Sequence, residues 1–173
     1  SSLFENFLAG VLHGLHDLMA FYAPTINSYK RSVPGVWSPL NATWGLENRT
    51  TALRVILGQD PKSTRVEQRT PGADLNPYIA MAATLASGLY GIEKKMPLLP
   101  AVKGSAYNLS SKEYPLLPRS LAEATERLKR SEIAREMMGE EFVDHYVRTR
   151  DWEVREYNKA VTNWELKRYM EII

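Results

Sequence analysis

The chain of 173 residues contains no cysteine, and this absence removes two classes of structure. Without thiols, neither a disulfide scaffold nor a zinc site with thiolate ligands can form. A chain without cysteine fits a reducing compartment, so we expect a cytoplasmic protein. No apolar run approaches the roughly 20 residues that a membrane span needs, so we expect no membrane partner.

Familiar signatures of nucleotide-binding and hydrolytic sites are also missing. The sequence contains no G-x-x-x-x-G-K-[ST], G-x-G-x-x-G, G-x-S-x-G or H-E-x-x-H pattern. Any nucleotide site must therefore be of a less familiar type.

Basic residues are abundant in one segment. The whole chain carries a net charge of only +2, which does not suggest a general nucleic-acid binder. Residues 30–69, however, include seven basic residues and only three acidic ones, Glu47, Asp60 and Glu67. The seven basic residues are Lys30, Arg31, Arg49, Arg54, Lys62, Arg65 and Arg69. Such a local excess suits phosphate or carboxylate ligands, although a solvated charged face is an equally good interpretation.

Hydrophobic periodicity and breakers predict the order helix, strands, helices, which is typical of an α+β fold. We expect helices at 2–22, from Asn76-Pro77 to about 95, and at 120–130, 132–138 and 140–172. Short strands, which we expect to be antiparallel, are predicted at 40–45, 50–57 and 64–69. Residues 96–118, with four prolines, are expected to run over the surface.

Two charged patterns could carry chemistry. In a strand, Arg65, Glu67 and Arg69 would share one face, either as an ion-pair row or as a site in which the glutamate holds a metal and the arginines hold anions. The stretch HGLHD places His13 and His16 three residues apart on a helix, a spacing that suits metal ligands. No third ligand is evident nearby, so a polar helix face is the favoured interpretation of that stretch.

Three ordered motifs resemble the C-terminal half of the glutamine synthetase family. They are PTINSYKRSVPG at 24–35, ENRTTALRV at 47–55 and RVEQRTPGADLNPYIAMAATLASGLYGI at 65–92. The resemblance implies that residues 1–173 are the C-terminal part of such a catalytic domain, with a helical tail. The N-terminal domain and the first half of the catalytic domain would be absent. It also implies a ligase that uses ATP to join the glutamate γ-carboxylate to ammonia or an amine through a γ-glutamyl phosphate. This chain would be the C-terminal fragment of that ligase, and we expect it to be inactive alone.

The resemblance assigns roles by position. Arg31 and Arg69 would contact the glutamate carboxylates, and Arg49 would stabilise the transferring phosphoryl group. The ATP phosphates would be bound by Arg54, Lys62 and Arg65. Glu67 would be a ligand of Mg²⁺ or Mn²⁺ near those phosphates. The family also implies a homo-oligomeric ring assembly.

One position departs from the family pattern. Where glutamine synthetases carry a flap glutamate that helps to bind ammonium, this chain has Trp37. An aromatic ring there could form an apolar or cation–π wall for an organic ammonium, which resembles the branch of the family that makes γ-glutamyl amides of amines or polyamines. The contrasting hypothesis is a non-catalytic structural relative that keeps the fold.

Overall fold

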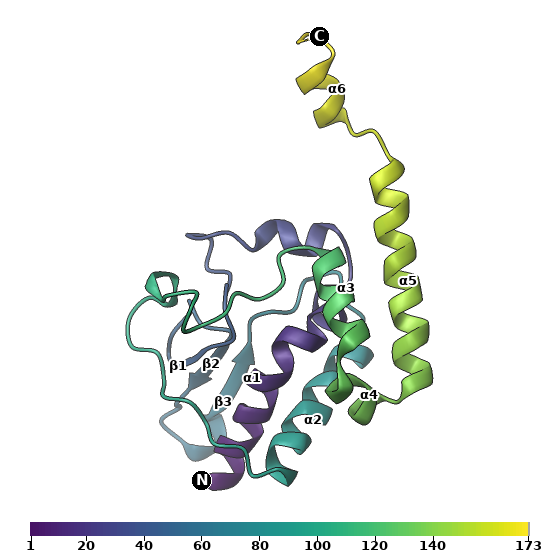
Figure 1. Ribbon diagram of the computed structural model, residues 1–173. Coiled ribbons are helices and arrows are strands. Elements are labelled where there is room, and N and C mark those ends of the chain that lie inside the picture. The colour runs from purple at the N-terminus through teal and green to yellow at the C-terminus, as the bar shows by residue number, and fades with distance from the viewer. Residues whose placement is uncertain (173) are drawn as a thin grey trace.

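The computed structural model describes residues 1–172, in which helices pack against a small sheet (Figure 1). The α-helices are α1 (Ser2–Tyr22), α2 (Pro77–Glu93), α3 (Leu121–Arg130), α4 (Glu132–Met138), α5 (Glu140–Lys159) and α6 (Asn163–Tyr169). The strands are β1 (Trp44–Leu46), β2 (Leu53–Ile56) and β3 (Arg65–Gln68). Short 3-10 helices lie at η1 (Asn27–Arg31), η2 (Pro61–Ser63) and η3 (Ala106–Asn108). The arrangement confirms the predicted α+β class.

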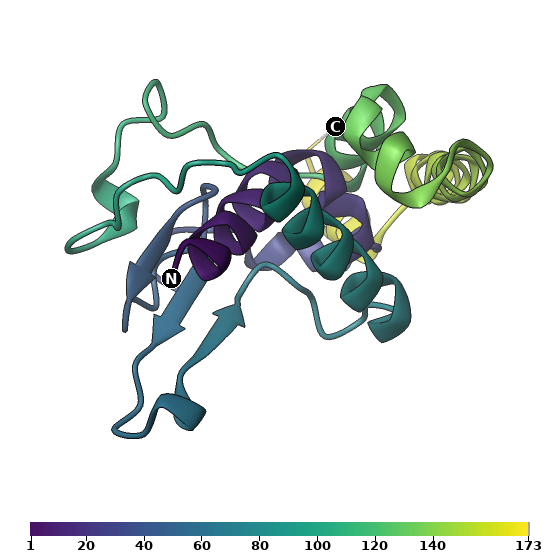
Figure 2. The same cartoon turned by 90° about the horizontal axis from the view of Figure 1, so that it is seen from below.

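The two long helices α1 and α2 cover one face of the sheet (Figure 2). Helix α1 ends at Tyr22, two residues before Pro24, because proline cannot continue the hydrogen-bonding pattern. Helix α2 begins as predicted: the side chain of Asn76 accepts hydrogen bonds from the backbone N–H groups of Tyr78 and Ile79. From β2, Leu53 and Val55 are buried beneath these helices and anchor the sheet in the core.

The sheet has the order β1-β2-β3, with β2 in the centre. Strands β2 and β3 are antiparallel, as predicted, but β1 and β2 are parallel, so the expectation of antiparallel strands was wrong for that pair. A compact loop at 47–52 makes the parallel pairing possible. Within this loop Glu47 adopts a left-handed φ of 51°, and the side chain of Asn48 accepts hydrogen bonds from the N–H and the hydroxyl of Thr50.

Strand β1 is also shorter and later than the predicted strand at 40–45. Only Trp44 and Gly45 of that range belong to it, and Asn41 forms an isolated bridge to Leu116. The segment 96–118 runs along this side of the molecule, since the N–H of Val102 donates to the carbonyl of Trp44.

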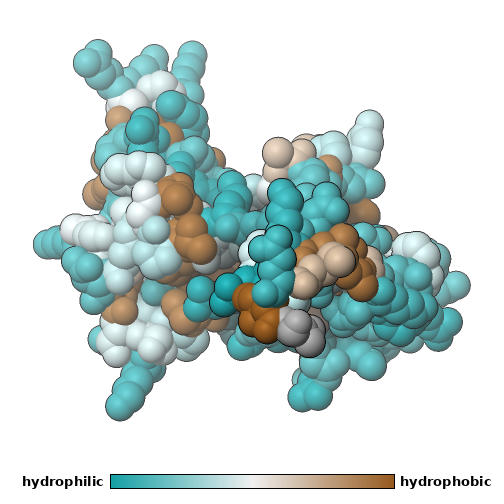
Figure 3. Space-filling model, turned by 90° about the horizontal axis from the view of Figure 1, so that it is seen from above, coloured by the Kyte–Doolittle hydropathy of each residue, from teal (hydrophilic) through white to brown (hydrophobic). Residues whose placement is uncertain are grey.

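The C-terminal part is helical, as predicted, but the expected helix at 140–172 is two helices. Helix α5 ends at Lys159, and Thr162 starts α6 with a capping box to Glu165. Helix α6 projects away from the rest of the chain, and hydrophobic side chains lie beside the C-terminus at this end (Figures 1 and 3). The exposed apolar residues here are Trp164, Leu166, Tyr169, Met170 and Ile172. None of the helices within residues 1–172 has the length and apolar character needed to cross a membrane.

Candidate active site

Charged residues gather on the face of the sheet that α1 and α2 leave uncovered. Strand pairing places Arg54 of β2 directly opposite Glu67 of β3. Their neighbours Leu53, Val55 and Val66 point to the core side, because side chains alternate along a strand. The pleat therefore separates the apolar core from the charged face.

Four side chains form a continuous row, which we call the arginine–glutamate cluster: Glu47, Arg54, Glu67 and Arg69. Nη2 of Arg54 lies 2.6 Å from Oε2 of Glu47, and its Nη1 lies 3.5 Å from Oε2 of Glu67. The other oxygen of Glu67 lies 2.9 Å from Nη1 of Arg69. The two guanidinium groups are largely covered, whereas both carboxylates stay about half exposed. The cluster thus presents alternating charges at a surface that a ligand can reach.

Arg69 connects three segments that are distant in sequence. Its Nε donates to the carbonyl of Arg49 at 3.1 Å, and its Nη2 donates to the carbonyl of Trp37 at 2.8 Å. Nη2 of Arg31 in turn donates to the carbonyl of Arg69 at 2.7 Å. The structure therefore brings together six of the residues predicted from the sequence: Arg31, Trp37, Arg49, Arg54, Glu67 and Arg69.

Two predicted phosphate ligands lie farther along the β2–β3 hairpin. Lys62 is exposed on η2, in the turn where the sequence placed it. Arg65 starts β3 opposite Ile56, and its Nη1 donates to the carbonyl of Ser63 at 3.1 Å. Neither contacts the cluster, so a single ligand that met all of these cations would have to extend along the hairpin (Figure 2).

The pKa values of two members of the cluster, Arg54 and Glu67, are shifted toward their charged forms. Partial burial would raise the pKa of Glu67, but the hydrogen bonds and charges of Arg69 and Arg54 outweigh it and lower the pKa below its usual value. The hydrogen bond from Arg54 to Glu47 raises the pKa of that arginine further. Glu67 is therefore a carboxylate that accepts hydrogen bonds and is not poised to donate a proton.

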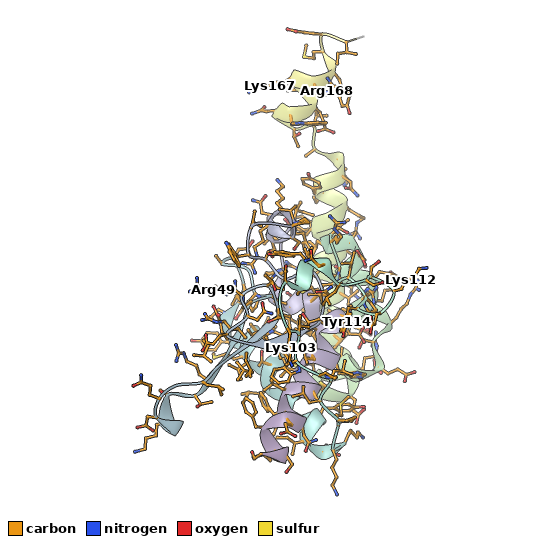
Figure 4. All side chains as sticks on the ribbon, turned by 90° about the vertical axis from the view of Figure 1, so that its left-hand side faces the viewer. Arg49, Lys103, Lys112, Tyr114, Lys167 and Arg168 are labelled. Atoms are coloured by element: carbon orange, nitrogen blue, oxygen red, sulfur yellow. The ribbon has the colours of Figure 1, made fainter. Side chains whose placement is uncertain are left out.

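A cavity of about 800 Å³ lies beside the cluster. Its lining includes Trp37, Glu47, Arg49 and Tyr107, and Figure 4 shows Arg49 on this side of the molecule. The hydroxyl of Tyr107 donates to the carbonyl of Ser38 at 3.1 Å, which ties the segment 96–118 to the loop that carries Trp37.

The backbone at the cavity is locally strained. Trp37 has a φ of 58° and is 61% exposed, an unusual conformation for a bulky side chain on an exposed loop. Such conformations persist where surrounding contacts enforce them, and the bond from Arg69 to the Trp37 carbonyl is one such contact. The tryptophan ring is thereby presented at the rim of the cavity.

Glu47 is the member of this site that sequence reasoning did not assign. The available signal was an acidic residue two positions before Arg49 in the ENR motif. Its contact with Arg54 depends on the tight loop at 47–52, which the sequence pattern did not reveal.

Within residues 1–172, no three histidine, aspartate or glutamate side chains come together as a metal centre. Glu67 supplies a carboxylate suitable for Mg²⁺ or Mn²⁺, but both of its oxygens are held by arginines. The described residues alone therefore do not fit a complete metal site.

The site thus combines a charged sheet face, a strained loop and a cavity within an α+β domain. Residues 1–169 match the family model described as "Glutamine synthetase, catalytic domain", and the chain belongs to that family.

Individual relatives agree with this assignment. The chain is 53% identical over 175 aligned positions to the type-1 glutamine synthetase 2 of Dictyostelium discoideum, covering 100% of this chain and 33% of the relative. It is 45% identical to a glutamate–isopropylamine ligase of a Pseudomonas species, with coverage of 97% and 36%. Among solved structures, a GmaS/ADP complex superposes with a TM-score of 0.83 at 31% identity, covering 99% of this chain and 40% of that one. The chain thus spans about a third of the length of the curated relatives it matches.

Proposed function

We propose that residues 1–173 form the C-terminal part of the catalytic domain of an ATP-dependent ligase. The reaction joins the γ-carboxylate of glutamate to ammonia or an organic amine. The observation that carries the proposal is the convergence of Arg31, Arg49 and Arg69 with the Arg54–Glu67 pair, since the reaction gathers negative charge on carboxylates and phosphates. Three relatives support it, named as a type-1 glutamine synthetase, a glutamate–isopropylamine ligase and a γ-glutamylethanolamide synthetase.

The proposed reaction has two steps. In the first, a γ-carboxylate oxygen attacks the γ-phosphorus of ATP, the bond to the bridging oxygen breaks, and ADP leaves. In the second, the neutral amine attacks the carbonyl carbon of the γ-glutamyl phosphate, inorganic phosphate leaves, and the nitrogen loses a proton. Arg31 and Arg69 would bind the glutamate carboxylates, and Arg49 would stabilise the phosphoryl group in transfer.

The nucleotide would lie along the hairpin, where Arg54, Lys62 and Arg65 offer three cations to its phosphates. Arg54 and Arg69 already hold Glu67, so these arginines would keep that carboxylate ionised until a ligand arrives. Glu67 would contribute one oxygen to Mg²⁺ or Mn²⁺, which neutralises phosphate charge when bound. The remaining ligands would come from outside this chain.

The complete protein would be a homo-oligomer. The supporting observation is the projecting α6, whose apolar side chains are exposed and suit a contact with another subunit. The chain alone would lack much of the site and would be inactive.

The experiment that tests the proposal is an amine panel with the full-length protein. Phosphate release is measured with ATP, glutamate and either ammonia or one of several alkylamines and polyamines. We expect organic amines to be preferred, because the exposed Trp37 ring offers an apolar and cation–π surface but no carboxylate for ammonium.

The matched variant is Trp37→Glu, which restores a carboxylate at this position. We expect it to raise kcat/KM for ammonia relative to amines by about tenfold, the equivalent of one modest contact of about 1.4 kcal/mol. A wild-type preference for ammonia would contradict the role of Trp37, and a folded protein inactive with every amine would favour a structural relative instead.

A further inference from the structure

A second cavity, of about 360 Å³, lies between the middle of α1 and the segment 96–118. It shares no lining residue with the cavity beside the arginine–glutamate cluster. Its lining includes Leu12, His13, His16, Leu99, Glu113 and Tyr114. The HGLHD stretch, which the proposed ligase reaction does not use, thus contributes two side chains to a separate cavity.

His16 lines this cavity with another part of its ring, because its Nδ1 has almost no accessible surface. Its Nδ1 is buried and has no hydrogen-bond partner among the described residues. Leaving such an atom unpaired is costly, at about 1–3 kcal/mol. The carboxylate of the adjacent Asp17 is occupied elsewhere, because its Oδ2 accepts a hydrogen bond from the hydroxyl of Ser131 at 2.7 Å.

The imidazole of His16 is held in its neutral form. Burial first, and the charge of Arg127 second, lower the pKa of His16 below 6.5, and these effects outweigh the opposing charges of Asp17 and Glu123. A neutral imidazole has one ring nitrogen that can accept a hydrogen bond. At neutral pH His16 therefore adds no positive charge to this wall.

The opposite wall supplies a negative charge and an aromatic ring. Glu113 is exposed and forms no ion pair with any residue that the structure describes. Next to it, Tyr114 is half-buried, and Figure 4 shows it on the same side of the molecule as Lys103. The other cavity residues are mainly apolar, including Leu12 and Leu99.

We propose that this second cavity binds a small primary alkylammonium ion. The carboxylate of Glu113 matches its charge, the ring of Tyr114 offers a cation–π face, and the apolar wall receives the alkyl chain. A neutral His16 adds no charge that would repel the ligand. The cavity volume lies at the lower end of the roughly 300–1,000 Å³ typical of small-molecule sites, so a short chain fits.

Calorimetric titration of the full-length protein with n-butylamine at pH 7.5 tests the proposal, with 1-butanol as a neutral probe of the same shape. Heat that Glu113→Gln removes is assigned to this cavity, because Glu113 does not line the cavity beside the arginine–glutamate cluster. We expect butylammonium to bind and 1-butanol to bind at least tenfold more weakly. Equal binding of the two probes would overturn the proposal, because the charge would then have no role.

Glu113→Gln should weaken butylammonium binding about tenfold and leave the fold unchanged, because Glu113 is exposed. The matched control is Glu171→Gln, another exposed glutamate, which should bind as the parent does. Unchanged affinity in Glu113→Gln would overturn the proposal. Because the experiment measures binding, it tests this proposal even if the ligase activity proposed above is absent.

Discussion

Arg69→Ala is expected to lower the proposed ligase activity of the full-length protein by about 10²–10³-fold, the loss typical of removing one charge-stabilising donor from an active site. The substitution would remove the proposed carboxylate ligand. It would also release the carbonyls of Trp37 and Arg49, which Arg69 holds at 2.8 and 3.1 Å. Substrate binding and the position of the aromatic loop would therefore fail together. Steady-state kinetics with glutamate, ATP and the preferred amine measure the effect.

The companion variants separate charge from geometry. Arg69→Lys keeps the positive charge but loses the planar fork that reaches three partners, so we expect it to recover only a small part of the activity. Arg148→Ala removes an exposed arginine from α5 and should behave as the parent protein. Circular dichroism and size-exclusion chromatography should show Arg69→Ala folded and assembled, because Glu67 remains about half exposed and keeps Arg54 as a partner. Near-normal turnover by a folded Arg69→Ala protein would contradict the assigned role.

Local signals explain which parts of the fold were predictable. Helix α2 begins where Asn76 can cap it and proline occupies the first helical position. Helix α3 begins at Leu121, close to the predicted start at 120, and the hydroxyl of its capping residue Ser120 accepts from the N–H of Glu123. These features lie within four residues of each other, so the sequence alone contains them.

Non-local pairing explains what was missed. The parallel register of β1 and β2 depends on a loop whose left-handed Glu47 leaves no sequence signature, since that conformation is unusual for glutamate. The break between α5 and α6 was missed because the hydrophobic pattern continues across 160–162 while the capping box restarts the helix at Thr162.

The candidate site was predictable to a similar extent. Alternation correctly predicted that Arg65 and Glu67 share one face of β3, but Arg69, the third predicted member of that row, lies just after the strand ends at Gln68. Alternation could not indicate that Arg65 bonds back to Ser63 while Arg69 reaches across to the Trp37 loop. The partners of the long guanidinium side chains depend on which groups the tertiary fold brings within their reach. The residue pattern of a single strand does not contain that information. The individual roles of these residues stay predictions for the kinetic tests.

Gly10→Ala is expected to destabilise the protein by about 1–3 kcal/mol, the range for adding a methyl group to a fully packed contact. A Cβ at Gly10 would lie 2.1 Å from the carbonyl oxygen of Ser87 and 2.7 Å from Cα of Gly91. Alanine at a helix interior would otherwise be favoured over glycine by about 1 kcal/mol, so the sign of the measured change decides between propensity and close packing. Equilibrium urea denaturation gives the free energy of unfolding.

Gly88→Ala provides the matched control in the same interface. There the three atoms nearest to the added Cβ are ring atoms of Phe7, the first at 2.1 Å, and this partly buried side chain near the start of α1 can rotate away. We therefore expect a smaller loss than for Gly10→Ala, whose obstacles are backbone atoms that move only if the helices separate. A separation of α1 from α2 would also disturb the charged face of the sheet, because the hydroxyl of Thr84 in α2 donates to Gln68 of β3 at 2.9 Å and Gln68 is next to Glu67. A Gly10→Ala protein as stable as the parent would show that the α1–α2 contact is looser than this packing requires.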